Sequence, residues 1–136
     1  MDTTSVERRS LLMSRIRSID TSPELVVRRL AHALGYRYVL HDKRLPGKPD
    51  LVFPARSKAI MVHGCFWHGH GCANSSTPKS NTAYWSAKLA GNIARDRKQQ
   101  RALRRMGWGV LTVWECATTK RNITSLERRL VRFLGP

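Results

Sequence analysis

Soft metal ligands are concentrated in one short segment of this 136-residue chain. Cys65, His70 and Cys72 form a C-x4-H-x-C pattern, and a further cysteine, Cys116, lies far downstream. Three thiolates and one imidazole are donors that a tetrahedral zinc ion prefers, and four protein ligands leave no position for a catalytic water. The pattern therefore predicts a closed, structural zinc site. Because the spacing matches no common zinc finger, three buried and inert thiols are the alternative.

A second set of groups suits phosphodiester chemistry. Asp50 follows Pro49 at the expected start of a strand, and the next strand ends at His63, shortly before His68. A carboxylate suits a hard ion such as Mg²⁺, which polarises a phosphate and stabilises the departing oxyanion. Either histidine could serve as base, acid or orienting group, since the ordinary pKa of imidazole is about 6.5. A Pro-Asp turn without catalytic meaning, and a histidine that only supports zinc ligands, are the alternatives.

Three aromatic side chains lie in or near the same region. Phe66 and Trp67 stand between glycines in residues 64–69, and Trp85 lies near the start of an expected basic helix. A glycine-flanked loop can push rings outward, and rings among basic residues can wedge between base steps. An aromatic side chain at a strand end more often belongs to the core, so core packing is the alternative for these rings.

The first half of the chain must position these residues through one helix and three strands. Ser22-Pro23 has the form of a helix start with Ser22 as N-cap, and apolar residues recur at helical spacing until Gly35. Strand patterns follow at residues 36–40, 51–53 and 59–62. The third is a continuous apolar run, which is typical of a buried central strand.

The second half of the chain predicts two helices and a strand. Asn81 can cap a long helix through about Arg105, a strand at 110–114 leads to Cys116, and a closing helix covers 122–134. The basic side of the long helix carries Lys88, Arg95, Arg97 and Lys98. The order of elements predicts one α/β domain over residues 1–136, with a central mixed sheet flanked by helices. Loops at strand ends of such a sheet commonly hold active sites.

The charge of the chain indicates a polyanionic partner. Lys and Arg total 25 against 9 Asp and Glu, which gives a net charge of +16 and a pI near 11.2. Binding to phosphates then releases condensed counterions, so nucleic acid is the expected partner. A merely soluble basic protein of ribosomal type is the alternative. An anionic membrane surface is disfavoured because the basic residues are spread along the chain.

The apolar runs, the N-terminal segment and the cysteine count indicate the cellular compartment of the protein. No apolar run approaches the ~20 residues needed to span a bilayer, and residues 1–10 lack a signal-peptide core, so a cytoplasmic protein is expected. An odd number of cysteines in a reducing compartment argues against disulfides. Residues 1–21 place arginines around apolar side chains and predict a basic helical arm whose ordering depends on DNA.

At the segment rich in histidine, cysteine and aromatic residues, the chain resembles the very short patch repair (Vsr) DNA endonucleases. The resemblance extends from about Arg9 to Ala117. Its motifs, in family order, are LPGKPD at 45–50, VHGCFWHGHGC at 62–72, NIARDR at 92–97, GW at 107–108 and VWEC at 113–116. The resemblance implies a restriction-endonuclease-like core, a variant of the PD-(D/E)xK superfamily. Met61-Val62-His63 stands where Glu-x-Lys is usual, so the second carboxylate and the lysine are absent.

The resemblance also implies roles for residues around two metals. Asp50 would bind Mg²⁺ beside the backbone carbonyl of Val62, and Glu24 would support the metal-bound water network. His63 and His68 would take acid–base and phosphate-contacting roles. The structural zinc ligands would be Cys65, His70, Cys72 and Cys116.

On the DNA side, the resemblance implies that aromatic residues intercalate next to a mismatch. These are Phe66, Trp67 and Trp85. Met13 on the N-terminal arm would enter from the other groove. Lys88, Arg95 and Arg97 of the basic helix are expected to bind the duplex.

The sequence thus predicts a Mg²⁺-dependent endonuclease that nicks one strand of duplex DNA at a T·G mismatch in very short patch repair. We expect a monomer, because one nick needs one site, located at the bacterial nucleoid, with mismatch-repair proteins as candidate partners. A sequence-specific nickase or restriction-type nuclease would share every catalytic residue. A noncatalytic zinc-stabilised DNA-binding module would have no reason for Asp50, His63 and His68 together. A zinc hydrolase would need an open position on the zinc.

Overall fold

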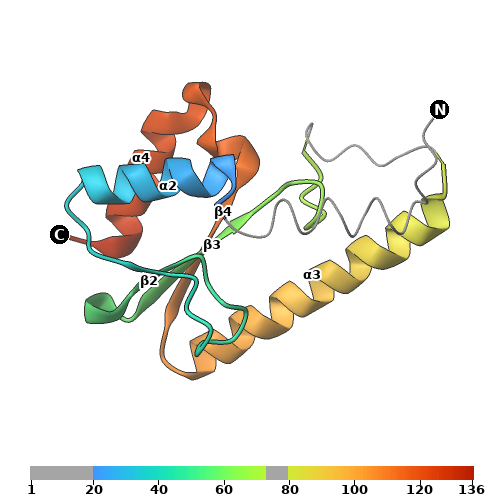
Figure 1. Cartoon of the computed structure of the whole chain (residues 1–136), viewed down its shortest axis with the longest axis horizontal. Helices are drawn as coiled ribbons and strands as arrows, with labels where there is room; N and C mark the ends of the chain where they lie inside the picture. Colours follow the sequence, from blue (N-terminus) through green and yellow to red (C-terminus); the bar gives the residue numbers. More distant parts are fainter. Residues whose placement is uncertain (1–19, 73–79) are drawn as a thin grey trace.

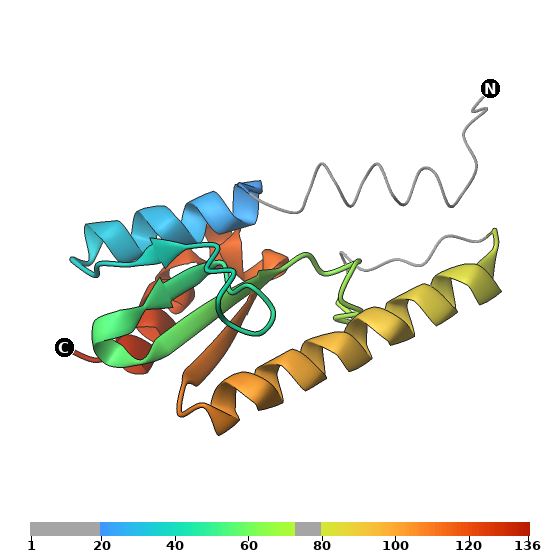
Figure 2. The same ribbon diagram turned by 60° about the horizontal axis from the view of Figure 1, so that its bottom comes forward.

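A computed structural model of the chain describes residues 20–72 and 80–136. A four-stranded sheet lies between two helices on one face and a long helix on the other (Figures 1 and 2). The expected N-terminal arm, including Met13, lies outside the described residues except for its last two positions. No helix in residues 20–72 or 80–136 is long and apolar enough to cross a membrane.

The sheet is mixed, as the sequence predicts. Its strands are β1 (Val39–Leu40), β2 (Leu51–Phe53), β3 (Lys58–His63) and β4 (Gly109–Trp114). They lie in the order β1-β2-β3-β4, in which the first three are antiparallel and β3 pairs with β4 in parallel. The predicted central strand is therefore β3, whose residues from Ala59 to Met61 are all buried.

Alternate residues of the central strands serve opposite faces of the sheet. On one face, α2 (Ser22–Ala33) and α4 (Ile123–Leu134) cover the main core. Its buried members are Val27, Ala31, Tyr36, Leu51, Phe53, Ile60, Val113, Leu126, Leu130 and Leu134. On the other face, α3 (Thr82–Arg105) packs on β4, and Gln100 donates a 3.0 Å hydrogen bond to the hydroxyl of Thr112.

Two predictions about the first elements are wrong. The N-cap of α2 is Thr21 and not Ser22, because Thr21 is extended and its hydroxyl accepts the backbone N–H of Glu24 at 3.3 Å. The first strand is limited to Val39–Leu40. Tyr36 belongs instead to the core, where its hydroxyl donates to the carbonyl of Gly135 at 2.5 Å and its ring packs edge-on against Phe53.

The long helix has the predicted bounds but a different start. Asn81 occupies the N-cap position of α3 with a left-handed backbone, φ +55°, and its side chain makes no capping hydrogen bond. The predicted Asn81 side-chain cap is therefore wrong. Only Trp85 and Leu103 of this helix are buried. Figure 2 shows why: the first half of α3 extends beyond the sheet, so most of its surface is left for solvent or a partner.

Candidate active site

Two parallel strand ends position the candidate site. In the register of β3 and β4, His63 lies opposite Trp114. Because both strands end at the same edge, the loop after β3 and the segment after β4 meet there. The carboxylate–histidine set and the cysteine set predicted from the sequence are consequently neighbours at one edge of the sheet.

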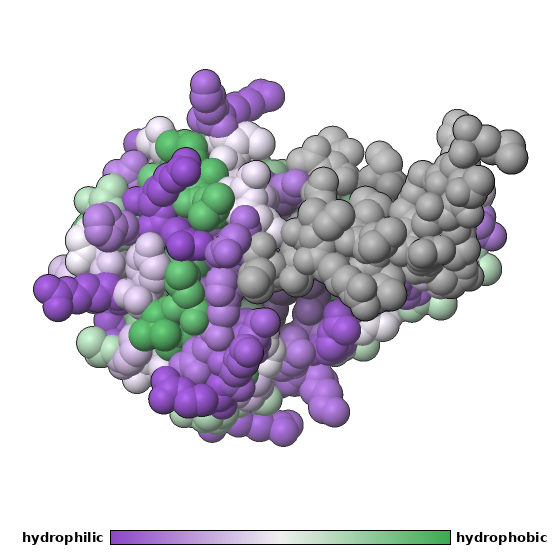
Figure 3. All heavy atoms as spheres, viewed as in Figure 1, coloured by the Kyte–Doolittle hydropathy of each residue, from purple (hydrophilic) through white to green (hydrophobic). Residues whose placement is uncertain are grey.

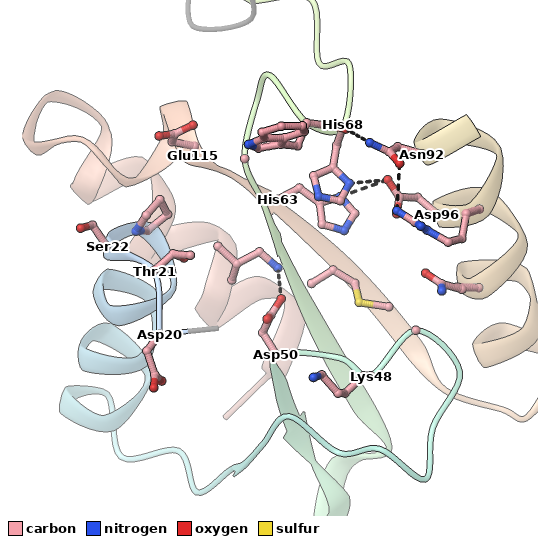
Figure 4. Close-up of a pocket in the computed structure, with 18 of the residues that line it drawn as sticks. Asp20, Thr21, Ser22, Lys48, Asp50, His63, His68, Asn92, Asp96 and Glu115 are labelled. Carbon is pink, nitrogen blue, oxygen red and sulfur yellow. Dashed lines mark hydrogen bonds and ion pairs between the residues drawn. The ribbon is translucent and has the colours of Figure 1, made fainter. Parts of the chain in front are cut away.

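A cavity of about 760 Å³ opens at this edge, between the start of α2, the end of β3 and α3. Figure 4 shows His63 and His68 on one side of it, close to Asp96, and Asp50 on another, with Lys48 beside Asp50. Its charged lining residues are Asp20, Asp50, Asp96, Glu115, Lys48, Lys88 and Arg95. A cavity with both carboxylates and cations can take up a metal ion together with a phosphate.

Asp50 is the central carboxylate of this cavity. Its Oδ2 accepts a 2.7 Å hydrogen bond from the backbone N–H of Val62, which fixes the side chain against β3. Burial raises the pKa of Asp50 to about 7; the Val62 N–H opposes this rise and the adjacent Glu24 carboxylate adds to it. Glu24 is buried and Asp50 is half-buried. Two such neighbouring carboxylates are stable together when a proton or a cation lies with them, so this pair suits a divalent ion.

The two predicted histidines form one unit with Asp96. The rings of His63 and His68 are stacked, with centroids 3.8 Å apart. Nδ1 of His68 lies 2.5 Å from Oδ2 of Asp96, and Nδ1 of His63 lies 4.0 Å from the same oxygen. Burial lowers the pKa of His63 to about 4, and the charge of His68 adds to this while Asp96 opposes it. His63 is therefore neutral at neutral pH, and Asp96 fixes the ring of His68 while leaving its Nε2 for proton transfer.

Trp114 separates this unit from the cysteine cluster. The ring of His70 stacks on Trp114 at 4.1 Å, while His63 and His68 meet the indole edge-on at 5.4 and 6.4 Å. The indole of Trp114 thus lies between His68 and His70 of the same loop. His68 belongs to the cavity, and His70 belongs to the cluster beyond it.

The predicted zinc ligands lie together. One ligand atom each from Cys65, His70, Cys72 and Cys116 lies within 4.8 Å of every other. Sγ of Cys116 is 3.6 Å from Nδ1 of His70, which is about the edge of a tetrahedron built on Zn–S and Zn–N bonds of ~2.3 and ~2.0 Å. Burial raises the pKa of the Cys65 thiol to about 12. The three thiols form no disulfide, and the donor set fits a closed zinc site.

The chain is similar to known DNA endonucleases. A family model described as DNA mismatch endonuclease Vsr matches residues 1–74. The chain is 50% identical to the type II nicking enzyme V.XorIIP of Xanthomonas oryzae pv. oryzae, over 99% of this chain and 98% of that enzyme. It is 40% identical to the DNA mismatch endonuclease Vsr of Escherichia coli, over 75% of this chain and 67% of that protein. The chain belongs to the Vsr family of DNA endonucleases.

Membership of the Vsr family accounts for the architecture. It implies a restriction-endonuclease-like core, and the mixed four-stranded sheet with flanking helices agrees with that core. A further relative, the type II nicking enzyme V.NmeAIP of Neisseria meningitidis, is 41% identical over 96% of this chain and 94% of its own length. The family resemblance predicted from the motifs is confirmed.

The predicted intercalating rings form one cluster in this Vsr-family chain. Phe66 lies 5.0 Å from Trp67 and 5.4 Å from Trp85, measured between ring centroids. Trp85 is 5% exposed, whereas Phe66 and Trp67 are half-buried. Asn92 holds the loop by donating a 2.8 Å hydrogen bond to the carbonyl of Trp67. The structure therefore places two rings at the surface and one, Trp85, beneath them, where it supports their position.

The predicted basic side of α3 adjoins the cavity. Lys88 and Arg95 line it, while Arg97 and Lys98 are exposed further along the same helix. The ammonium of Lys88 lies 6.0 Å from the centre of the Trp67 ring. Hydrophilic side chains also cover much of the described surface seen in Figure 3. The positive charge and the surface rings thus share one side of the site.

Several residues of the site escape prediction from the residues alone. Asp96 is named only within the NIARDR motif, and nothing in its helix spacing indicates that it contacts two histidines. No chemical pattern in the sequence includes His41, which lies 2.9 Å from the predicted Glu24. The same holds for Trp114, which stacks on His70. Lys48 occupies the loop just before Asp50 with a left-handed backbone, φ +44°. The motif LPGKPD marks this loop, but only the fold shows that Lys48 lines the cavity.

Proposed function

We propose that this protein is a Mg²⁺-dependent endonuclease that nicks one strand of duplex DNA beside a T·G mismatch. The observation that carries the proposal is one cavity that holds Asp50, with the buried Glu24 carboxylate adjacent to it, together with an imidazole oriented by Asp96. Carboxylates suit the ion, and an oriented imidazole suits the proton transfer that phosphodiester hydrolysis needs.

The residues present fit a magnesium ion. Asp50 would bind it, with the carbonyl of Val62 as the neighbouring ligand and Glu24 accepting hydrogen bonds from water. Once bound, the ion supplies charge that polarises the scissile phosphate and stabilises the leaving oxygen. The Val62 N–H keeps Asp50 in place by engaging one carboxylate oxygen, so the other remains for the ion.

His68 is the proposed general base. Asp96 accepts the Nδ1–H of His68, which makes Nε2 the basic nitrogen and allows it to take a proton from an attacking water. His63, neutral and stacked on His68, is proposed to contact the phosphate and to limit rotation of the partner ring. The exposed cations Lys48 and Arg95, which line the same cavity, would bind the DNA backbone.

The cysteine cluster is proposed to be a structural zinc site. Its donors come from the loop after β3 and from the segment after β4, so a shared ion would tie the two strand ends together. Such a tie supplies folding free energy and holds the loop that carries His68 on one side and Phe66 and Trp67 on the other.

The proposed selectivity for a mismatch depends on the aromatic cluster and the basic helix. Phe66 and Trp67 would insert beside the mismatch, supported by Trp85, and Met13 would enter from the other groove. Lys88, Arg95 and Arg97 would bind phosphates without reading sequence. We further propose that the enzyme is a monomeric, single-domain protein of the cytoplasm, acting at the nucleoid with mismatch-repair proteins as candidate partners.

One gel experiment tests this function. Supercoiled plasmid, a matched duplex and a duplex with one T·G pair are incubated with the protein, with Mg²⁺ and with EDTA. We expect a single-strand nick in the T·G duplex alone, and only with Mg²⁺. Two of the relatives are named nicking enzymes, so equal nicking of matched duplex would favour a sequence-specific nickase. Cleavage that persists in EDTA would overturn the role of magnesium.

A further inference from the structure

His41 makes a contact that the mechanism above does not use. Its ring nitrogen Nε2 lies 3.0 Å from Oε1 and 2.9 Å from Oε2 of Glu24. The terminal torsion of a Glu side chain is broad, so a carboxylate is free to rotate unless partners fix its plane. Two nearly equal contacts to a single nitrogen restrict that rotation. His41 therefore restricts the plane of the Glu24 carboxylate.

His41 is also tied to the proposed metal ligand through its backbone. Its N–H donates a 3.1 Å hydrogen bond to the backbone carbonyl of Asp50. The residue follows β1 with a left-handed backbone, φ +49°, which non-glycine residues seldom adopt. This conformation places the backbone of His41 on Asp50 and its ring on Glu24. One residue thus contacts both the backbone of Asp50 and the carboxylate of Glu24.

Glu24 requires such support because it is buried. It is 1% exposed, and its carboxylate contacts His41 and Arg28, whose guanidinium lies at the longer distance of 3.4 Å and also pairs with Asp20 at 2.8 Å. Arg28 is thus shared between two carboxylates, whereas His41 engages both oxygens of one. Of these two partners, His41 holds Glu24 more closely.

We propose that His41 is a positioning residue for metal binding: it fixes the Glu24 carboxylate, so that Glu24 can hold water on the divalent ion that Asp50 binds. This inference rests on the proposed function. It predicts that loss of the ring contact weakens the affinity for the ion by about 10- to 100-fold, the range typical of residues that support metal ligands, and leaves the fold intact.

Two substitutions separate the ring contact from the backbone. His41→Asn suits the left-handed conformation, because asparagine adopts it more readily than most residues, but its amide is too short to reach Glu24. His41→Gln places an amide N–H as many bonds from the backbone as Nε2 of histidine. Tyr38→Phe is the matched control, since it removes a neighbouring 3.2 Å hydrogen bond to the carbonyl of Arg28 without touching Glu24.

The readouts are Mn²⁺ binding to the zinc-replete protein without DNA, followed by electron paramagnetic resonance, together with the Mg²⁺ concentration for half-maximal nicking and the melting temperature. We expect His41→Asn to raise both metal constants by about tenfold or more and to melt within a few degrees of wild type. His41→Gln should restore both constants to within about threefold, and Tyr38→Phe should leave them unchanged.

The inference is overturned if His41→Asn binds Mn²⁺ as tightly as wild type, or if Gln and Asn weaken binding equally while both lower the melting temperature. The second result would make His41 a residue of the fold only. Failure of the proposed function is distinguishable, since wild type would then neither bind Mn²⁺ outside the cysteine cluster nor depend on Mg²⁺.

Discussion

The two polar clusters beside Trp114 share the loop after β3 but differ in how open they are and in their donor atoms. The cavity cluster has carboxylates and imidazoles around a space of about 760 Å³, whereas the cysteine cluster brings its ligand atoms to within 4.8 Å of one another. His68 serves the first and His70 the second. Gly69 between them has φ +61°, and a Cβ there would lie 2.6 Å from Ile93 Cδ1, so glycine favours this division of the loop.

The difference shows how partners assign roles to identical side chains. In the proposed mechanism Asp96 engages one nitrogen of His68 and leaves the other for proton transfer, whereas the thiols around His70 would make it a zinc ligand. The clusters should also differ in energy. The buried Asp50 beside Glu24 costs stability until a cation binds, whereas a closed zinc site adds stability. Substitutions in the two clusters should therefore have opposite effects on stability, and the following predictions run from the largest to the smallest effect on nicking.

Asp50→Asn should abolish nicking and stabilise the magnesium-free protein. The pKa of Asp50 is raised from 3.8 to about 7 in the fold, so the stability that its proton provides is full below pH 3.8 and lost as the pH rises through about 7. Asparagine never ionises and still accepts the Val62 N–H. The variant should be more stable than wild type near pH 8 by on the order of 1–4 kcal/mol.

Urea unfolding in the absence of Mg²⁺ measures this difference, with zinc retained. The gain should shrink near pH 5, where Asp50 of the wild type is largely protonated, and Mg²⁺ should reduce it near pH 8 by stabilising the wild type alone. Nicking by the variant at a rate near that of wild type would contradict the assignment of Asp50 as the metal ligand. A variant less stable than wild type at both pH values would show that the ionised Asp50 beside Glu24 does not lower the free energy of unfolding.

Asp96→Asn should slow single-turnover nicking by about 10²- to 10⁴-fold, the usual contribution of general acid–base catalysis. An amide no longer favours a proton on Nδ1 of His68, so the wrong tautomer becomes populated. DNA affinity should change little, because Asp96 adds no positive charge to the interface. Gel-shift isotherms and rapid-quench rates test the two quantities separately. A loss of affinity equal to the loss of rate would assign Asp96 to DNA binding and not to orienting His68.

Cys116→Ser should act on stability first and on nicking second. A hydroxyl is a poor zinc ligand, so the protein should lose its zinc and several kcal/mol of stability, whereas Asp50→Asn gains stability. Metal analysis should find about one zinc ion per chain in wild type prepared without chelator. Below its lowered melting temperature, the variant should retain part of its nicking rate. Wild type without zinc, or a variant that melts as wild type does, would contradict the closed site.

The sequence predicts the frame of the molecule well because its signals are local. Apolar periodicity marks α3, β3 and α4 within a few residues, and the order of elements predicts the mixed sheet. Local signals fail where a distant contact decides the conformation. The sequence predicts Tyr36 in a strand, but its hydroxyl is hydrogen-bonded to the carbonyl of Gly135. The sequence predicts Asn81 as a side-chain cap, but its backbone is left-handed and its side chain makes no capping hydrogen bond.

The same limit applies to the candidate site. Asp50, the two histidines and the cysteine set are indicated by residue type and spacing, whereas the role of Glu24 depends on the family resemblance. Partners such as Asp96 and His41 come from other elements, and only the packing of α3 and β1 on the sheet brings them to the histidines and to Glu24. The motifs thus indicate the metal ligands, but the groups that orient those ligands and the histidines are identified only by the tertiary structure.

The smallest predicted effect separates the surface rings from the basic helix. Arg97 is exposed on α3, and phosphate contacts carry no sequence information, so Arg97→Ala should weaken matched and mismatched duplex alike and reduce the salt dependence. Trp67 is half-buried beside Lys88 and Phe66, where its ring can stack on a base. Opening a T·G step costs less than opening a matched step, and stacking returns ~1–3 kcal/mol per base.

Trp67→Ala should therefore lower the ratio of mismatched to matched affinity, by about 5- to 150-fold if the full stacking free energy is lost, and leave the slope of affinity against salt almost unchanged. Binding isotherms over a salt series, on both duplexes, for wild type and the two variants measure both quantities. The Asn92 hydrogen bond holds the Trp67 backbone, so the loop should keep its conformation when the ring is removed. If Trp67→Ala keeps the full affinity ratio while Arg97→Ala reduces it, selectivity comes from the helix and the ring belongs to the core.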